Sequence, residues 1–165
     1  MGKDNLALSM EQMQHLLSLG IKADGATMVY HPNSGRSDIF RLERNTFTYS
    51  REFWDNPKRK AIAGEDIFER LHGRDVFAFT TADLMAILPE SITISGIPHS
   101  LLISKKRIDD VVVYIASYSF VDASGKFISK RNDTYWESAV MVQLLHSVLM
   151  WLIDNKFVNP KEIEL

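Results

Sequence analysis

A long apolar segment near the end of the sequence restricts the fold more than any other feature. We predict a helix from Tyr135 to about Lys156. A capping box starts it, in which the side chains of Thr134 and Glu137 each bond the other residue's backbone amide. Its apolar residues lie on nearly every side of the helix: Trp136, Ala139, Val140, Met141, Val142, Leu144, Leu145, Val148, Leu149, Met150, Trp151, Leu152 and Ile153.

A helix that is apolar all round must be covered on more than one side. We therefore expect this helix to be the structural spine of the core. Leu145, Leu149 and Trp151 should be largely buried in it.

The first part of the chain carries a second helix-start signal. Ser9 and Gln12 form a capping box, and Gly20 is a typical helix end. Runs of β-branched and aromatic residues predict strands at 26–30, 38–42 and 46–49, with a turn at 31–35. We expect a long loop at 51–60, a short helix near 65–72 that ends at Gly73, and a short apolar run of undetermined type at 76–79.

The later part of the chain repeats this pattern of helix followed by strands. Thr80 or Thr81 is expected to cap a helix that ends at Pro89. Further strands are predicted at 92–94, 101–103, 111–120 and 127–128. We place the basic residues at 105–107 in a turn, and we read Asp109 and Asp110 as a solvated hairpin end.

These elements predict an α+β fold, in which an antiparallel sheet has helices packed on one face and the long C-terminal helix is the core spine. A chain of 165 residues is about one domain, so we expect a single domain over 1–165. A subdivision into 1–79 and 80–165 is the alternative, since each part opens with a capped helix.

The composition narrows the biochemical classes. There is no cysteine, which excludes thiol nucleophiles, disulfides, iron–sulfur clusters and cysteine-based zinc sites. The start of the sequence has no apolar signal region, and the apolar tract at 139–153 is too short to span a bilayer. We therefore expect a cytoplasmic protein with no membrane association.

Several segments resemble the short uncharacterised proteins that prophages and mobile elements of gut bacteria encode. The segments are 9–21, 26–30, 79–89 and 151–157. The resemblance implies an accessory protein of phage or mobile-element origin. It brings no known activity and no functional residues.

No catalytic residue, metal ligand or cofactor site can be assigned from the sequence. No two of the five histidines are spaced two or four residues apart, and the zinc-protease pattern H-E-x-x-H is absent. Asp109 and Asp110 are neighbours in sequence, and side chains at such positions of a strand point to opposite faces.

Basic residues are the better lead. Three runs fall in predicted loops and would hold phosphates if they met on one surface: Lys58, Arg59 and Lys60; Lys105, Lys106 and Arg107; Lys130 and Arg131. The simpler interpretation is that such runs are solvated loop ends. The net charge of -2 argues against extensive coating by nucleic acid.

Three functional hypotheses remain open. The first is a non-enzymatic accessory or interaction protein with an unknown protein partner. The second is a nucleic-acid-binding protein, indifferent to base sequence, that uses the basic loops. The third is an enzyme with dispersed acid–base residues. Surplus apolar surface on the long helix also leads us to expect a homodimer, with contacts through Tyr135, Met141, Met150 or an exposed strand edge.

Overall fold

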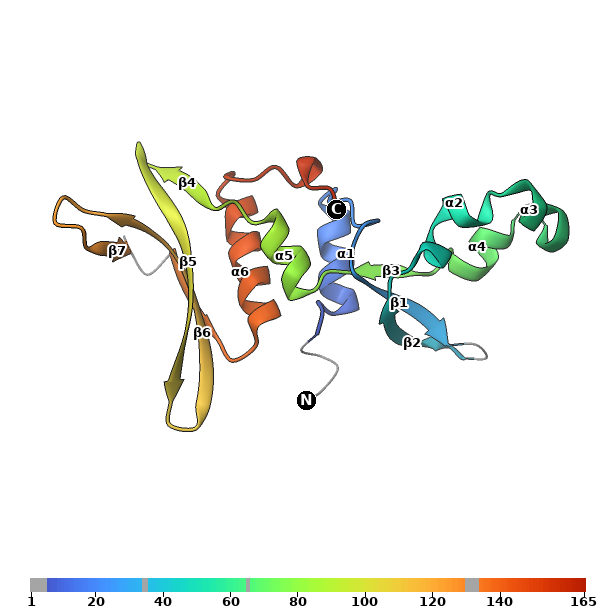
Figure 1. Ribbon diagram of the computed structural model, residues 1–165, viewed down its shortest axis with the longest axis horizontal. Helices are drawn as coiled ribbons and strands as arrows, with labels where there is room; N and C mark the ends of the chain where they lie inside the picture. The colour runs from blue at the N-terminus through green and yellow to red at the C-terminus, as the bar shows by residue number, and fades with distance from the viewer. Residues whose placement is uncertain (1–5, 34–35, 65, 130–133) are drawn as a thin grey trace. The chain divides into compact units, whose positions relative to one another are not determined.

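The computed structural model covers residues 1–165 and describes the chain outside residues 1–5, 34–35, 65 and 130–133. The fold is α+β with antiparallel sheets, as the sequence predicts (Figure 1). The chain divides into two compact units: unit 1 is Met1–Asp83 with Pro160–Leu165, and unit 2 is Leu84–Asn159. Within the described residues, none of the helices has the length and apolar character needed to cross a membrane.

Unit 1 contains a three-stranded antiparallel sheet in the order β2-β1-β3. The strands are β1 (Met28–Asn33), β2 (Arg36–Arg44) and β3 (Val76–Ala78). The helices are α1 (Met10–Ser18), η2 (Phe47–Tyr49, a 3-10 helix), α2 (Arg51–Trp54), α3 (Pro57–Ala63), α4 (Ile67–His72) and η4 (Pro160–Glu162, a second 3-10 helix). Helix α1 packs beside β3, and the amide of Leu8 donates to the carbonyl of Phe79 at 2.9 Å.

Two helix starts of unit 1 follow the predicted local rules. Ser9 and Gln12 form the capping box of α1, and Gly20 follows that helix with a φ of 97°. Helix α5 (Thr81–Ile87) starts in unit 1, where Thr80 and Asp83 bond each other's backbone amides at 3.3 and 2.8 Å. Short-range signals were therefore sufficient at both positions.

Unit 2 contains a five-stranded antiparallel sheet in the order β4-β5-β6-β7, with β8 also paired to β6. Its strands are β4 (Ser91–Ile94), β5 (Ile97–Ile108), β6 (Val111–Val121), β7 (Phe127–Ser129) and β8 (Tyr135–Ser138). Strands β4 and β5 are joined by Ser95 and Gly96, which both have positive φ, as a type I′ hairpin turn requires. Helix α6 (Met141–Asp154) packs against β6 and β8.

Helix α6 is the core spine of unit 2. Leu145 and Leu149 are fully buried, which confirms the prediction for both. Trp151 is only half-buried, so the prediction for this residue is too strong. Its ring packs against Trp136 at 5.4 Å and Phe157 at 5.2 Å between centroids. The indole therefore forms one side of an aromatic cluster and does not fill the core.

The predicted start of this helix is wrong. Residues Tyr135–Ser138 form β8, and the helix begins only at Met141. Glu137 bonds Lys106 on β5, so it does not cap the helix. A capping box contributes about 1 kcal/mol. Pairing with β6 and packing of Trp136 against α6 outweigh it, because aromatic residues suit a half-buried strand.

Three other assignments also need correction. The segment predicted as a loop contains α2 and α3; the side chain of Ser50 caps the first, and that of Asn56 caps the second, followed by Pro57. Residues Phe47–Tyr49 form a 3-10 helix, and the predicted strand is absent there. The three basic residues at 105–107 lie within β5, and the turn is at Asp109 and Asp110.

Candidate metal centre in unit 1

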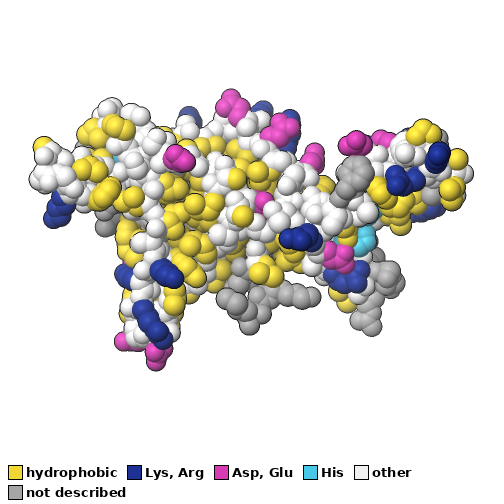
Figure 2. Space-filling view, in the orientation of Figure 1, with side chains coloured by type: hydrophobic (Ala, Val, Ile, Leu, Met, Phe, Trp, Pro, Cys, Tyr) yellow, Lys and Arg dark blue, Asp and Glu magenta, His cyan; other side chains and the backbone are white. Residues whose placement is uncertain are grey.

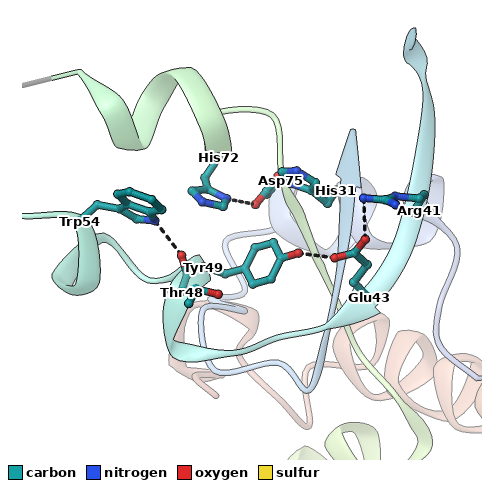
Figure 3. A network of polar contacts seen from close by, with 8 residues as sticks. All are labelled: His31, Arg41, Glu43, Thr48, Tyr49, Trp54, His72 and Asp75. Carbon is teal, nitrogen blue, oxygen red and sulfur yellow. Dashed lines mark hydrogen bonds and ion pairs between the residues drawn. The ribbon is translucent and has the colours of Figure 1, made fainter. Parts of the chain in front are cut away.

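Three potential metal ligands meet beside the small sheet of unit 1. They are His31 of β1, His72 at the end of α4, and Asp75 just before β3 (Figure 3). The Nδ1 atom of His31 lies 2.7 Å from one carboxylate oxygen of Asp75. The Nδ1 atom of His72 lies 2.8 Å from the other. One carboxylate thus joins two imidazole rings.

Strand register and one tight turn bring these residues together. Strand β1 pairs with β3 so that Tyr30 faces Val76. The next position along this antiparallel register sets His31 beside Asp75. Gly73 connects α4 to β3, and a Cβ atom there would come within 2.5 Å of the carbonyl oxygen of Glu69. The missing side chain lets the chain turn close to the helix and directs Asp75 back towards His72.

The cluster is largely shielded from solvent. The side chains of His31, His72 and Asp75 are 23%, 9% and 4% exposed. Aromatic rings surround His72, with the centroid of Tyr49 at 5.1 Å and that of Trp54 at 5.8 Å. Such packing fixes the orientation of the imidazole, which is what a preformed ligand site needs.

A second polar chain lies beside the histidines. The hydroxyl of Tyr49 donates to Glu43, and Arg41 pairs with the same carboxylate at 2.9 Å (Figure 3). Burial, followed by the hydrogen bond to Glu43, raises the pKa of Tyr49 to about 12. The phenol is therefore protonated at neutral pH and acts as a hydrogen-bond donor.

The cluster forms part of the wall of a pocket with a volume of about 710 Å³. His72, Asp75 and Tyr49 are among the residues that line it. The remaining wall is mixed polar and apolar: Asp24, Asn45, Thr46, Ser50, Arg51, Phe68, Glu69, Gly73 and Phe77. A ligand held at the histidines would therefore have open space next to it for a further group.

The donor set has a defined chemistry. The coordinating atoms of His31, His72 and Asp75 all lie within 4.8 Å of one another, and no other such group of three occurs in the part of the chain that the structure describes. Imidazole nitrogens with one carboxylate oxygen suit zinc and the neighbouring divalent transition metals. Calcium and magnesium prefer oxygen ligands alone.

The basic residues expected to bind phosphate have different surroundings. In unit 1, Lys58 is exposed on α3. Arg59 places its guanidinium 3.6 Å from the centre of the Phe53 ring, and Lys60 pairs with Asp55 at 3.2 Å. Arg59 and Lys60 thus have structural contacts. The rings of Phe53 and Trp54 pack edge to face, with centroids 5.1 Å apart.

The second basic run lies on β5 of unit 2. Lys105 is exposed, Lys106 pairs with Glu137 at 2.8 Å, and Arg107 pairs with Asp110 at 3.3 Å. Lys130 and Arg131 lie outside the described residues. The first two runs thus belong to different units, and a shared phosphate-binding surface stays a prediction.

Sequence reasoning missed the histidine cluster because its ligands are far apart in the chain. Neither His31 nor His72 has another histidine at a metal-binding spacing. Asp75 lies three residues after His72, and this short spacing was the one local signal available.

Comparisons with protein-family models, curated proteins and solved structures found no match. The resemblance to prophage and mobile-element proteins therefore stays a prediction.

Proposed function

We propose that this protein binds a divalent transition-metal ion, with Zn²⁺ as the best-fitting example, through His31, His72 and Asp75. The observation that carries the proposal is the convergence of three coordinating atoms within 4.8 Å of one another. They come from β1, the end of α4 and the turn before β3, and lie in a shielded site at a pocket wall.

Charge favours a cation at this position. With neutral imidazole rings, the two hydrogen bonds to Asp75 leave a carboxylate charge in a site where only 4% of that side chain is exposed. A buried charge is costly unless an opposite charge or a metal offsets it. A divalent ion would use the same oxygen and nitrogen atoms, with the two Nδ1 atoms deprotonated.

Three protein ligands leave at least one coordination position for an exchangeable group, which is the arrangement of reactive zinc sites. The pocket next to His72 and Asp75 gives such a group space. The proposal is thus a metal site with ligand access, which also gives the sequence-based hypothesis of an enzyme a specific location.

Titration with Co²⁺ tests the proposal, because protein-bound cobalt absorbs visible light and substitutes for Zn²⁺. We expect one ion per chain, displaced by Zn²⁺. His72→Ala and Asp75→Asn should each weaken binding at least about tenfold. His15→Ala is the matched control, since His15 is an exposed histidine on α1 of the same unit, and it should bind like the wild type.

Far-ultraviolet circular dichroism establishes that each variant is folded before its affinity is compared. Azide added to the cobalt form should change the visible spectrum if a position is open to the pocket. No cobalt binding by the wild type, or equal binding by His72→Ala, would reduce the cluster to a hydrogen-bonded network and refute the proposal.

We also propose that the protein self-associates in the cytoplasm, as expected from the sequence. What supports self-association is a set of exposed apolar side chains on the sheet of unit 2: Ile108, Val111, Val112, Val121, Phe127 and Tyr135. Sedimentation at tens of micromolar protein tests it, and a monomer under those conditions contradicts it.

A further inference from the structure

We propose that the outer edge of β5, from Leu102 to Ile108, binds an extended acidic segment of a partner protein by adding it as a strand to the sheet. This surface belongs to unit 2 and is independent of the histidine cluster.

The edge is long and has no strand partner among the described residues. Strand β4 covers β5 only from Ile97 to Ser100, and the amide of Leu101 donates to the carbonyl of Glu90 at 2.8 Å. From Leu102 onward β5 is paired with β6 alone. Seven residues of strand span about 20 Å, and alternate residues direct their backbone N–H and C=O groups outward.

The charge along this edge selects the occupant. Lys105 and Arg107 are two residues apart, so their side chains lie on the same face of β5. Lys105 makes no ion pair within the described residues, and the pair of Arg107 with Asp110 has side chains that are 70% and 100% exposed. Such exposed pairs contribute little and exchange readily. Figure 2 shows Lys and Arg side chains along the hairpin that β5 forms with β6, with acidic side chains at its tip.

A second copy of the same edge fits poorly. Two β5 strands paired with each other would bring lysine and arginine of one copy close to those of the other, and opposed like charges destabilise a strand pair. Lysine on an edge commonly prevents such self-pairing. Carboxylates at alternate positions of a different strand would instead complement Lys105 and Arg107.

A pocket with a mixed polar and apolar lining lies at the other end of the edge. A pocket of about 660 Å³ is lined by Met85, Leu88, Glu90, Ser91, Ser100, Leu101 and Ile103. Leu101 and Ile103 share a face of β5 with Lys105 and Arg107. A strand antiparallel to β5 would place carboxylates opposite the two cations first and apolar side chains at the pocket afterwards.

This order defines the probe, a fluorescein-labelled peptide of sequence Glu-Thr-Glu-Thr-Val-Thr-Leu. Fluorescence anisotropy at low salt should show binding that weakens as salt rises. The double variant Lys105→Glu/Arg107→Glu should bind it about tenfold less tightly and should bind Lys-Thr-Lys-Thr-Val-Thr-Leu more tightly than the wild type does. The double variant Lys126→Glu/Lys156→Glu carries the same charge change at exposed sites elsewhere in unit 2 and should bind like the wild type.

Amide hydrogen exchange locates the contact. The bound peptide should slow exchange within residues 102–108 and leave β7 unchanged, because only the free edge gains hydrogen bonds. No binding by the wild type, equal weakening in the Lys126→Glu/Lys156→Glu variant, or protection away from 102–108 would each overturn the proposal. Binding of both peptides in proportion to net charge alone would also overturn it.

Discussion

Replacement of Asp83 tests how much one shielded carboxylate contributes to the stability of unit 1. Only 7% of this residue is exposed. One oxygen accepts hydrogen bonds from the amides of Thr27 at 3.1 Å and Thr80 at 2.8 Å, and from the Thr80 hydroxyl at 2.9 Å. The other oxygen accepts from the Thr27 hydroxyl at 2.6 Å. The carboxylate therefore links the residue before β1 to the start of α5.

The expected loss of unfolding free energy follows from these contacts. A hydrogen bond to a charged group contributes about 1.5 kcal/mol or more. The two hydroxyls can turn to water after Asp83→Ala, but the two amides are fixed by the backbone. We therefore expect Asp83→Ala to lower the free energy of unfolding by about 3 kcal/mol. Asp83→Asn keeps an oxygen for the amides but loses the charge and the second oxygen, which accepts from the Thr27 hydroxyl, so it should cost about 1 kcal/mol, less than Asp83→Ala.

Urea denaturation followed by circular dichroism measures both values. Thr27→Val removes one hydroxyl partner and gives a double-mutant cycle with Asp83→Ala, in which the two effects should not add. A loss below about 1 kcal/mol for Asp83→Ala would refute the assignment. So would an equal loss for Asp83→Asn and Asp83→Ala, because the geometry would then be irrelevant.

Three further outcomes are expected. Leu149→Ala should lower the free energy of unfolding by about 2–5 kcal/mol in urea denaturation, since Leu149 is fully buried on α6. Trp151→Ala should lower the free energy of unfolding by about 3 kcal/mol, because the contacts of the indole with its aromatic neighbours are lost, and an unchanged melting temperature would contradict this. The pKa of Tyr49 near 12 exceeds its ordinary 10.0, so the associated stability is fully present below pH 10 and is lost as pH rises through 12. Absorbance titration of the wild type against Tyr49→Phe should show this midpoint.

Elements whose signals lie within a few residues were predictable. The capping boxes at Ser9 and Thr80 act between a side chain and an amide three residues away, so the sequence displays both partners together. The solvated turn at Asp109 and Asp110 follows in the same way from local residue preferences. Ser50 and Asn56 were comparable signals for α2 and α3, but the aromatic and basic residues around them led to the prediction of a loop.

Elements that depend on distant partners were not predictable. Tyr135–Ser138 carry a local helix-start signal, yet they form a strand paired with β6. The hydrogen bonds of this pairing and the packing of Trp136 contribute more free energy than one helix cap does. The open edge of β5 is likewise a property of the whole sheet, since it depends on where β4 ends.

The sequence by itself determined the α+β class, the helix caps at Ser9 and Thr80, and the absence of cysteine chemistry. Only the tertiary structure decided that His31 and Asp75 face each other across the β1–β3 register and that the turn at Gly73 brings His72 to the same carboxylate. The physical reason is that local conformational preferences act over a few residues, whereas a ligand site depends on register and chain reversal between segments that the sequence keeps apart.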